Sequence, residues 1–225
     1  MTAKLIFPVL LGLAGCAVLI ALGVWQLQRL DWKLGVIAEA EAMMAAEPEP
    51  LPVGPEPADW NRRPVSLDGT LAGEELHVLT SGTAAGTGYR AIARVDLADG
   101  RAVMADLGLL PVDDKEASAT TGPVSITGNL LWPDDVNSST PAPDLDRNIW
   151  FGRDVDAMAE ALGTEPVLVT VRALTPPDPR TVPLPLDTAQ FKNDHLSYAI
   201  TWFGLAIVWA GMTAFLIRRT LQKDA

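Results

Sequence analysis

Two long apolar runs without a charged residue, one near each end of the chain, constrain this sequence more than any other feature. Residues 5–25 provide 21 such positions, and residues 198–217 provide 20. A helix of about 20 apolar residues is long enough to cross the hydrocarbon core of a bilayer. The sequence therefore predicts a membrane protein with transmembrane helices at residues 5–25 and 196–217.

The basic residues around these runs indicate which way the chain crosses the membrane. Lys4 precedes the first run, and three basic residues follow the second. Because Lys and Arg are retained on the cytoplasmic side, we expect residues 1–4 and the basic tail 218–225 in the cytoplasm of a multi-pass protein. No Arg- and Ser-rich presequence precedes the first run, which favours a bacterial inner membrane with the central domain in the periplasm.

A cleaved signal is the alternative interpretation of the first run. Residues 13–16, Leu-Ala-Gly-Cys, fit the cleavage pattern of a bacterial lipoprotein. A mature lipoprotein normally becomes polar after its cysteine, whereas the apolar sequence AVLIALGVW follows Cys16. We therefore favour a retained membrane anchor.

Between the two runs the sequence changes character twice. Leucines recur at spacings of three and four after the first run, which predicts an amphipathic helical extension over residues 26–47. The proline-rich residues 48–62 predict a stiff, extended linker. Residues 63–190 have the pattern of strands and turns, and we expect a β-rich periplasmic domain there.

The strand pattern of this domain is most evident in two similar segments. RPVSLDGTL at residues 63–71 and GPVSITGNL at residues 122–130 share an alternation of apolar and polar residues that is typical of half-buried strands. The pair Asp99-Gly100 predicts a hairpin, and residues 155–162 predict one short helix. The expected fold is a small, mostly antiparallel β (α+β) domain flanked by two transmembrane helices. Further strands are expected at residues 75–80, 90–97, 101–107 and 167–174.

The central segment excludes several classes of function. Between residues 26 and 197 it carries 13 Lys/Arg against 27 Asp/Glu, a net charge of −14. Such a surface repels phosphate backbones, so we expect no nucleic-acid partner. Two histidines and one cysteine are too few for a structural zinc site, and the sequence contains neither GxxxxGK[ST] nor GxSxG. We interpret His77 as a surface or satisfied histidine, and we expect no enzyme.

The membrane edges carry the most informative polar residues. If the two helices pair, an imidazole, a guanidinium and several aromatic rings would meet at one depth near the outer interface. The same residues also fit an ordinary interfacial belt, in which Arg29 contacts lipid phosphates. Helical spacing places three residues on one face of each helix: Trp25, Arg29 and Trp32 on the first, and His195, Tyr198 and Trp202 on the second.

These residues belong to two longer motifs that carry a resemblance to a known family. The motifs are Gly23-x-Trp25-Gln26-x-x-Arg29-x-x-Trp32-Lys33 and Asn193-x-His195-Leu196-x-Tyr198-Ala199-x-Thr201-Trp202-Phe203. With them the chain resembles the Surfeit-locus-one family of cytochrome c oxidase assembly proteins, which share the order helix, β-rich domain, helix.

The resemblance implies a non-catalytic assembly factor that assists haem a insertion into the catalytic subunit of a haem-copper cytochrome c oxidase. The family's suggested haem-iron ligand matches His195, and haem a would be bound transiently. Partners would be the oxidase catalytic subunit, other oxidase assembly factors and membrane lipid. Imidazoles ligate haem iron, aromatic faces suit a porphyrin, and a guanidinium can pair with a propionate. The implied haem-binding residues are His195, Tyr198, Trp202, Arg29, Trp25 and Trp32.

The sequence departs from the family at two places. The family carries Asn-Asn before the histidine, whereas this chain has Asn193-Asp194, and Asp106-Leu107-Gly108-Leu109 stands where the family has Asn-Arg-Gly-Trp. Asp194 would either orient His195 or cap the second helix. The alternative function is an oxidase-associated accessory subunit or chaperone that binds protein partners but no haem.

Overall fold

The computed structural model describes residues 3–83, 85–188 and 193–223, which form two compact units. The helical unit comprises the residues up to Ala40 and from Thr188 onward, and the barrel unit comprises Glu41–Asp187. Residues 1–2 and 224–225 of the expected cytoplasmic ends, and residues 189–190 of the expected β domain, lie outside the described residues.

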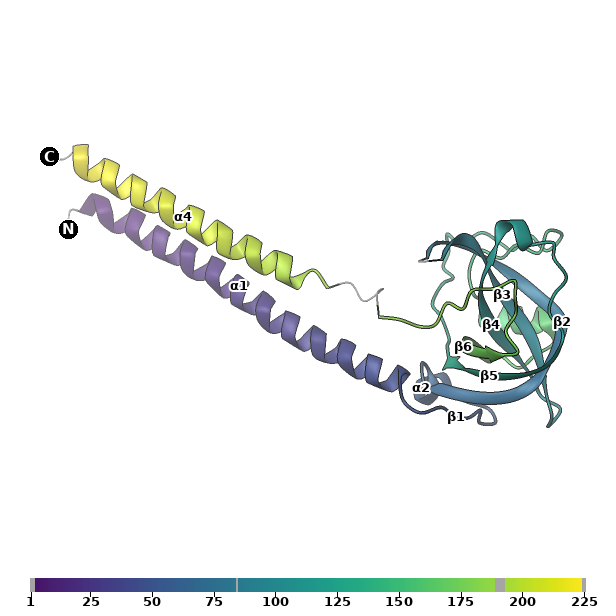
Figure 1. Ribbon diagram of the computed structural model, residues 1–225. Helices are drawn as coiled ribbons and strands as arrows, with labels where there is room; N and C mark the ends of the chain where they lie inside the picture. The colour runs from purple at the N-terminus through teal and green to yellow at the C-terminus, as the bar shows by residue number, and fades with distance from the viewer. Residues whose placement is uncertain (1–2, 84, 189–192, 224–225) are drawn as a thin grey trace. The chain divides into compact units, whose positions relative to one another are not determined.

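The helical unit contains two long helices that run side by side in opposite directions (Figure 1). Helix α1 spans Ala3–Met44 and helix α4 spans His195–Lys223. Both are long and apolar enough to cross a membrane, so both expected spans are present as helices. Helix α4 continues beyond the expected boundary at residue 217 because the residues that follow are good helix formers. Helix α1 ends at Met44, three residues before the expected end of the amphipathic extension.

Glycines allow the two helices to pack closely. A Cβ atom at Gly23 would lie 2.7 Å from the Phe203 ring, and one at Gly12 would overlap the methyl group of Thr213. The Trp209 indole also donates a hydrogen bond of 3.2 Å to the carbonyl oxygen of Gly12. Small residues let helix backbones approach in this way, which maximises van der Waals contact between helices that lie in an apolar medium.

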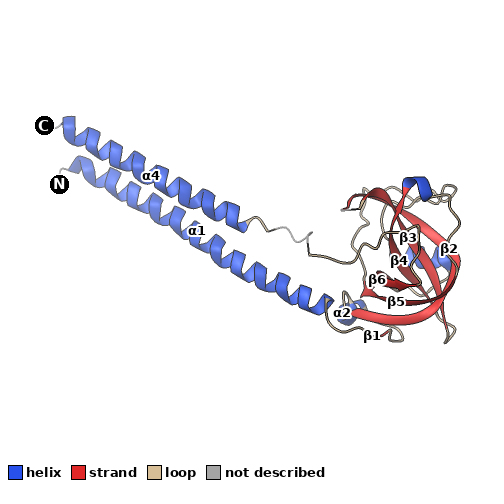
Figure 2. Cartoon of the chain, in the orientation of Figure 1, coloured by secondary structure: helices blue, strands red, loops and turns tan. Residues whose placement is uncertain are grey.

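The barrel unit is a closed sheet (Figure 2). Strand β2 pairs with β5 over residues 64–71 and with β3 over residues 69–83, so that residues 69–71 pair with both. The sheet order is β1-β2-β3-β4-β6-β5, and the additional β2–β5 pairing closes the strands β2 to β6 into a barrel, with β1 attached alongside β2. The β1–β2 and β4–β6 pairings are parallel and the others antiparallel. Closure gives each of the strands β2 to β6 a paired strand on both sides. The strands are β1 (Glu49–Pro50), β2 (Pro64–Thr83), β3 (Gly86–Leu97), β4 (Ala102–Pro111), β5 (Gly122–Leu130) and β6 (Leu168–Thr175).

The two similar segments of the sequence pair with each other. Residues 64–71 of β2 lie antiparallel to β5, with Leu67 opposite Ile126. The expected strands at residues 63–71 and 75–80 are one continuous strand, because β2 passes through an irregularity at Gly73, whose φ is +88°. The expected hairpin at Asp99-Gly100 is confirmed: it joins β3 to β4, and the φ of Gly100 is +87°.

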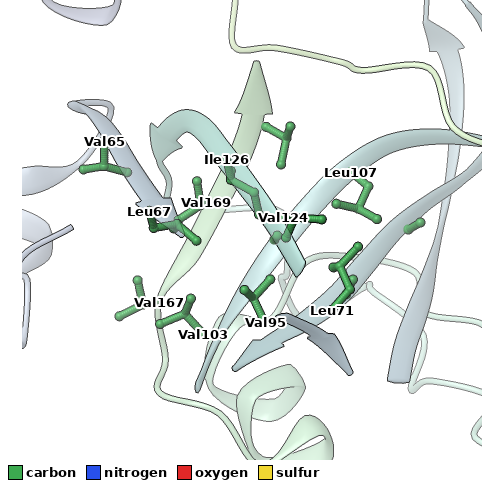
Figure 3. Close-up of a cluster of buried hydrophobic side chains, with 14 of the residues drawn as sticks. Val65, Leu67, Leu71, Val95, Val103, Leu107, Val124, Ile126, Val167 and Val169 are labelled. Atoms are coloured by element: carbon green, nitrogen blue, oxygen red, sulfur yellow. The ribbon is translucent and has the colours of Figure 1, made fainter. Parts of the chain in front are cut away.

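The barrel interior is filled by branched aliphatic side chains that alternate along the strands (Figure 3). A second buried cluster lies under α3 (Val155–Leu162) and includes Met158, Met104 and Trp150. Helix α3 has the bounds that the sequence predicted, with Asp154 as its N-cap and Gly163 in the left-handed conformation at its end. The labelled interior residues of Figure 3 are Val65, Leu67, Leu71, Val95, Val103, Leu107, Val124, Ile126, Val167 and Val169.

Residues 48–62 are attached to the barrel, in contrast to the extended linker that the prolines predicted. Strand β1 pairs with β2, and a short helix, α2, spans Pro57–Trp60. Leu51 and Trp60 pack against the interior cluster. Burial of these two apolar side chains explains why the segment is ordered against the sheet.

Candidate functional site at the paired membrane helices

The helix pair brings the two sequence motifs into contact. Gly23 of the first motif packs against Phe203 of the second. One turn along, the side chain of Gln26, which is only 9% exposed, forms a hydrogen bond of 2.8 Å with Nδ1 of His195. Two segments that lie at opposite ends of the sequence therefore form one local structure within the helical unit.

The hydrogen bond indicates which nitrogen of the His195 ring carries a proton. It joins Nδ1 to Oε1 of Gln26, and an amide oxygen can only accept. Nδ1 therefore carries a proton in this arrangement, and Nε2 of the neutral ring has a free lone pair. The ring is half-buried at the first residue of α4, and no described residue forms a hydrogen bond with Nε2. This arrangement leaves Nε2 available as a ligand atom.

Arg29 lies one turn beyond Gln26 on α1 and stacks on an aromatic ring. Its guanidinium carbon is 3.9 Å from the centroid of the Trp32 ring, within the range of a cation–π interaction. Both side chains are exposed. Among the described residues no hydrogen bond joins Arg29 to His195, so the structure brings Arg29 together with Trp32 and brings His195 together with Gln26.

The predicted residues occupy one side of the helix pair. Successive residues of a helix are about 100° apart, so Trp25 and Arg29 are displaced from Gln26 in the same rotational sense, by roughly 60–100°. On α4, Tyr198 is displaced in that sense from Ala199, which is buried in the contact. Because the two helices run in opposite directions, residues that are displaced from the contact in the same rotational sense on each helix lie on the same side of the pair. The residues on this side are Trp25, Arg29, Trp32, His195, Tyr198 and Trp202.

The aromatic rings on this side are accessible. Trp25, Trp32 and Tyr198 are 53%, 52% and 56% exposed, and Trp202 is half-buried. Exposed aromatic rings at the end of a membrane helix are typical of the interface, where one part of the ring contacts lipid and another contacts water. They also offer flat apolar surfaces beside His195.

The comparisons with known proteins match most of the chain. The sequence model of the SURF1 family matches residues 13–207, which include both motifs and the barrel. The chain belongs to the SURF1 family. Surfeit locus protein 1 of Rattus norvegicus is 29% identical over 82% of this chain and 67% of its own, and that of Xenopus tropicalis is 29% identical over 91% and 73%. A SURF1-like protein of Monosiga brevicollis is 30% identical over 88% of this chain and 83% of its own.

SURF1 family members are known as cytochrome oxidase assembly factors and are associated with membranes. With its two long apolar helices, this chain is a membrane protein in which transmembrane helices flank a small, mostly antiparallel β domain. The matched region begins inside α1 and ends inside α4, so it covers the positions of both Gln26 and His195.

The barrel of this SURF1 member contains the second histidine, in a buried ion-pair cluster. His77 is 5% exposed, and its Nε2 lies 2.9 Å from Oε1 of Glu75. Burial opposes ionisation of Glu75, but hydrogen bonds from Arg180 and His77 outweigh it and lower the pKa of Glu75 to about 2. Asp178 pairs with the same guanidinium at 2.8 Å. The cluster attaches the segment after β6 to β2, which is a structural role for His77.

The departure from the family on β4 also has a structural explanation. Asp106 is fully buried and accepts a hydrogen bond of 2.6 Å from Arg90 on β3. Gly108 has a φ of +104°, and a Cβ atom there would overlap the carbonyl oxygen of Val182. This segment therefore links β4 to β3 and packs it closely against the chain at Val182. Among the described residues, no group of three or more His, Cys, Asp or Glu side chains is arranged to hold a metal ion.

Gln26 is the residue of this site that the sequence analysis did not single out. It stands within the first motif, between Trp25 and Arg29, but motif matching assigns it no role. The sequence feature that could have identified Gln26 is its polarity. It lies at a position that the helical period places in the contact between two apolar helices. Asp194 was expected either to orient His195 or to cap the second helix, and the hydrogen-bond partner described for the His195 ring is Gln26.

Proposed function

We propose that this chain is a non-catalytic assembly factor that assists haem a insertion into the catalytic subunit of a haem-copper cytochrome c oxidase. It would act in a bacterial inner membrane, with the barrel in the periplasm and the basic residues beyond α4 in the cytoplasm. Membership of a family of oxidase assembly factors supports the general role, and the positive-inside rule supports the orientation.

The observation that carries the haem proposal is the state of His195. The residue is half-buried, its Nδ1 forms a hydrogen bond with Gln26, and its Nε2 has no hydrogen-bond partner among the described residues. A neutral imidazole with a free Nε2 is a common axial ligand of haem iron. Oδ1 of Asn193, two residues earlier, is also buried without a hydrogen-bond partner in the described part of the chain. These two atoms with available lone pairs fit a metal ion or a hydrogen-bond donor of a ligand at this end of the helix pair.

The other side chains fit the periphery of a porphyrin. Trp25, Tyr198 and Trp202 offer aromatic surfaces on the same side of the pair as His195, where bilayer lipid would accommodate an apolar substituent. Arg29, supported by its stack on Trp32, would pair with a propionate carboxylate. A site with one protein ligand at an exposed helix edge is suited to release its cargo as well as to bind it.

The second candidate function is an accessory subunit or chaperone that binds the oxidase or its other assembly factors but no haem. The acidic balance of the segment between the membrane runs, 13 Lys/Arg against 27 Asp/Glu, favours it. A surface with that excess of carboxylates would select basic protein surfaces and repel acidic ones.

The experiment that separates the two candidates is a spectrum of the purified protein. The chain is expressed in a membrane that makes haem a, purified in mild detergent, and compared with His195→Ala and with the neighbouring exposed control Ser197→Ala. An a-type band in the parent and in Ser197→Ala that weakens or shifts in His195→Ala supports haem handling through His195. A colourless parent, obtained while haem a is available in the same membrane, removes that function and leaves the second candidate.

A further inference from the structure

We propose that Gln26 is a positioning residue for His195: it holds the ring in the tautomer with the proton on Nδ1 and so presents Nε2 as the only ligand atom. The inference rests on the proposed function where it concerns haem, and on the geometry of the helix pair where it concerns the ring.

The hydrogen bond is built into the packing of the helices. Gln26 is 91% buried by its neighbours, one turn from the close contact between Gly23 and Phe203. A buried amide oxygen without a donor is destabilising, and the bond to His195 supplies the donor. The packing contact between α1 and α4 therefore favours the ring orientation in which Nδ1 faces Gln26.

The bond also selects the tautomer. In a neutral imidazole either nitrogen can carry the proton, and a fixed acceptor beside one nitrogen assigns the proton to it. With Oε1 of Gln26 at 2.8 Å from Nδ1, the lone pair is on Nε2, the nitrogen that no described residue contacts. Without the acceptor, part of the population would carry the proton on Nε2 and could not act as a ligand.

The same bond strengthens Nε2 as an electron-pair donor. A ligating histidine commonly donates its other N–H to a carbonyl or carboxylate oxygen, which fixes the ring and raises its basicity. Loss of such an outer partner typically lowers metal affinity about 10- to 100-fold. Gln26 is in the position of that partner, supplied by the opposite helix.

The test compares three variants of the chain with the parent and uses a fourth, His195→Ala, for assignment. Gln26→Leu removes the acceptor but keeps an apolar side chain of similar size, and Gln26→Glu keeps an acceptor oxygen. Gln28→Leu is the matched control, because Gln28 is exposed on the same helix two residues away. The chain has only two histidines, so the ring nitrogens of His195 are identified in a ¹⁵N-histidine spectrum by their loss in His195→Ala.

The first readout is the tautomer in haem-free protein, measured at about pH 9, where an ordinary imidazole is neutral. We expect a protonated Nδ1 and an unprotonated Nε2 in the parent, in Gln26→Glu and in Gln28→Leu, and a mixture of tautomers in Gln26→Leu. A parent with the proton on Nε2, or a Gln26→Leu spectrum identical to that of the parent, overturns the inference. If Gln26→Glu keeps the parent tautomer and Gln26→Leu does not, the acceptor oxygen positions the ring, and the volume of the side chain alone is not sufficient.

The second readout is the affinity for haemin, added to the same detergent samples. We expect Gln26→Leu to bind about 10- to 100-fold more weakly than the parent, with Gln28→Leu unchanged. If the parent shows the expected tautomer but binds neither haemin nor haem a, the proposed function fails while the positioning of His195 stands. If the parent binds haemin and Gln26→Leu matches it in both readouts, the positioning role fails and the proposed function stands.

Discussion

Glu75 and Arg180, which are 105 positions apart in the sequence, form two hydrogen bonds of 2.9 Å between one carboxylate and one guanidinium. Their side chains are 8% and 9% exposed. This two-point contact ties β2 to the segment that follows β6, on the side of the barrel where His77 is buried. A pair so well shielded from water behaves differently from a surface ion pair, and two predictions follow from that difference.

Replacement of the cation should destabilise the barrel strongly. Arg180→Met leaves the carboxylates of Glu75 and Asp178 buried without their partner, which typically costs about 3–5 kcal/mol. We expect a correspondingly lower denaturant midpoint for loss of β structure, followed by circular dichroism in detergent. Arg147→Met is the control, because Arg147 is 73% exposed and its contact with Asp144 is 3.8 Å long. Equal losses in the two variants would contradict the structural role of the buried cluster.

The stability of the barrel should depend on pH through Glu75. Its pKa is about 2 in the folded protein, below the ordinary glutamate value of about 4.3. A carboxyl group with a lowered pKa contributes its full stabilisation above the unfolded value, and the contribution disappears as the pH falls toward the folded value. The stability difference between the parent and Glu75→Gln should therefore be constant from pH 7 to about 5 and shrink between about pH 4.5 and 2. Denaturant midpoints of both proteins across that range measure it, and a difference that persists undiminished to about pH 2 would refute the assignment.

Local patterns in the sequence predicted most of the helices and strands, but not that the strands close into a barrel. The alternation in residues 63–71 and 122–130 identified two strands, and the structure shows that they pair with each other. Nothing local predicts that β2 pairs with β3 along one edge and with β5 along the other, since that depends on the sum of long-range pairings. The proline-rich residues 48–62 were misjudged for the same reason, because their attachment depends on a barrel that a local pattern does not contain.

At the membrane edge, helical spacing predicted which residues share a face, but not which of them touch. The contact between Gln26 and His195 depends on the rotation of each helix about its axis. Packing at Gly12 and Gly23 sets that rotation. The stack of Arg29 on Trp32 is a local contact three residues apart, and spacing alone was sufficient to place both on one side.

The helix pairing can be tested by cross-linking through the native cysteine. The Cys16 sulfur lies 3.9 Å from the backbone oxygen of Ala206, so Ala206→Cys should place two sulfur atoms within reach across the seam. Mild oxidation in membranes should then produce an internal disulfide that shifts mobility on a non-reducing gel. Ile207→Cys is the control, because Ile207 is 74% exposed and its side chain is directed away from α1. Cross-linking of the control at the same rate as Ala206→Cys would contradict the antiparallel register.

The contribution of Arg29 can be separated from that of His195. Arg29→Gln removes a charge that would pair with a propionate, together with the stack on Trp32, but leaves the Gln26–His195 hydrogen bond untouched. We expect about tenfold weaker binding of haemin, which corresponds to about 1.4 kcal/mol, with an unchanged tautomer in the ¹⁵N spectrum of His195. Arg218→Gln, an exposed arginine near the other end of α4, controls for a general effect of charge. A loss of affinity equal in both variants would mean that Arg29 acts only through the net charge of the protein, and a changed tautomer in Arg29→Gln would mean that Arg29 helps to hold the helix seam itself.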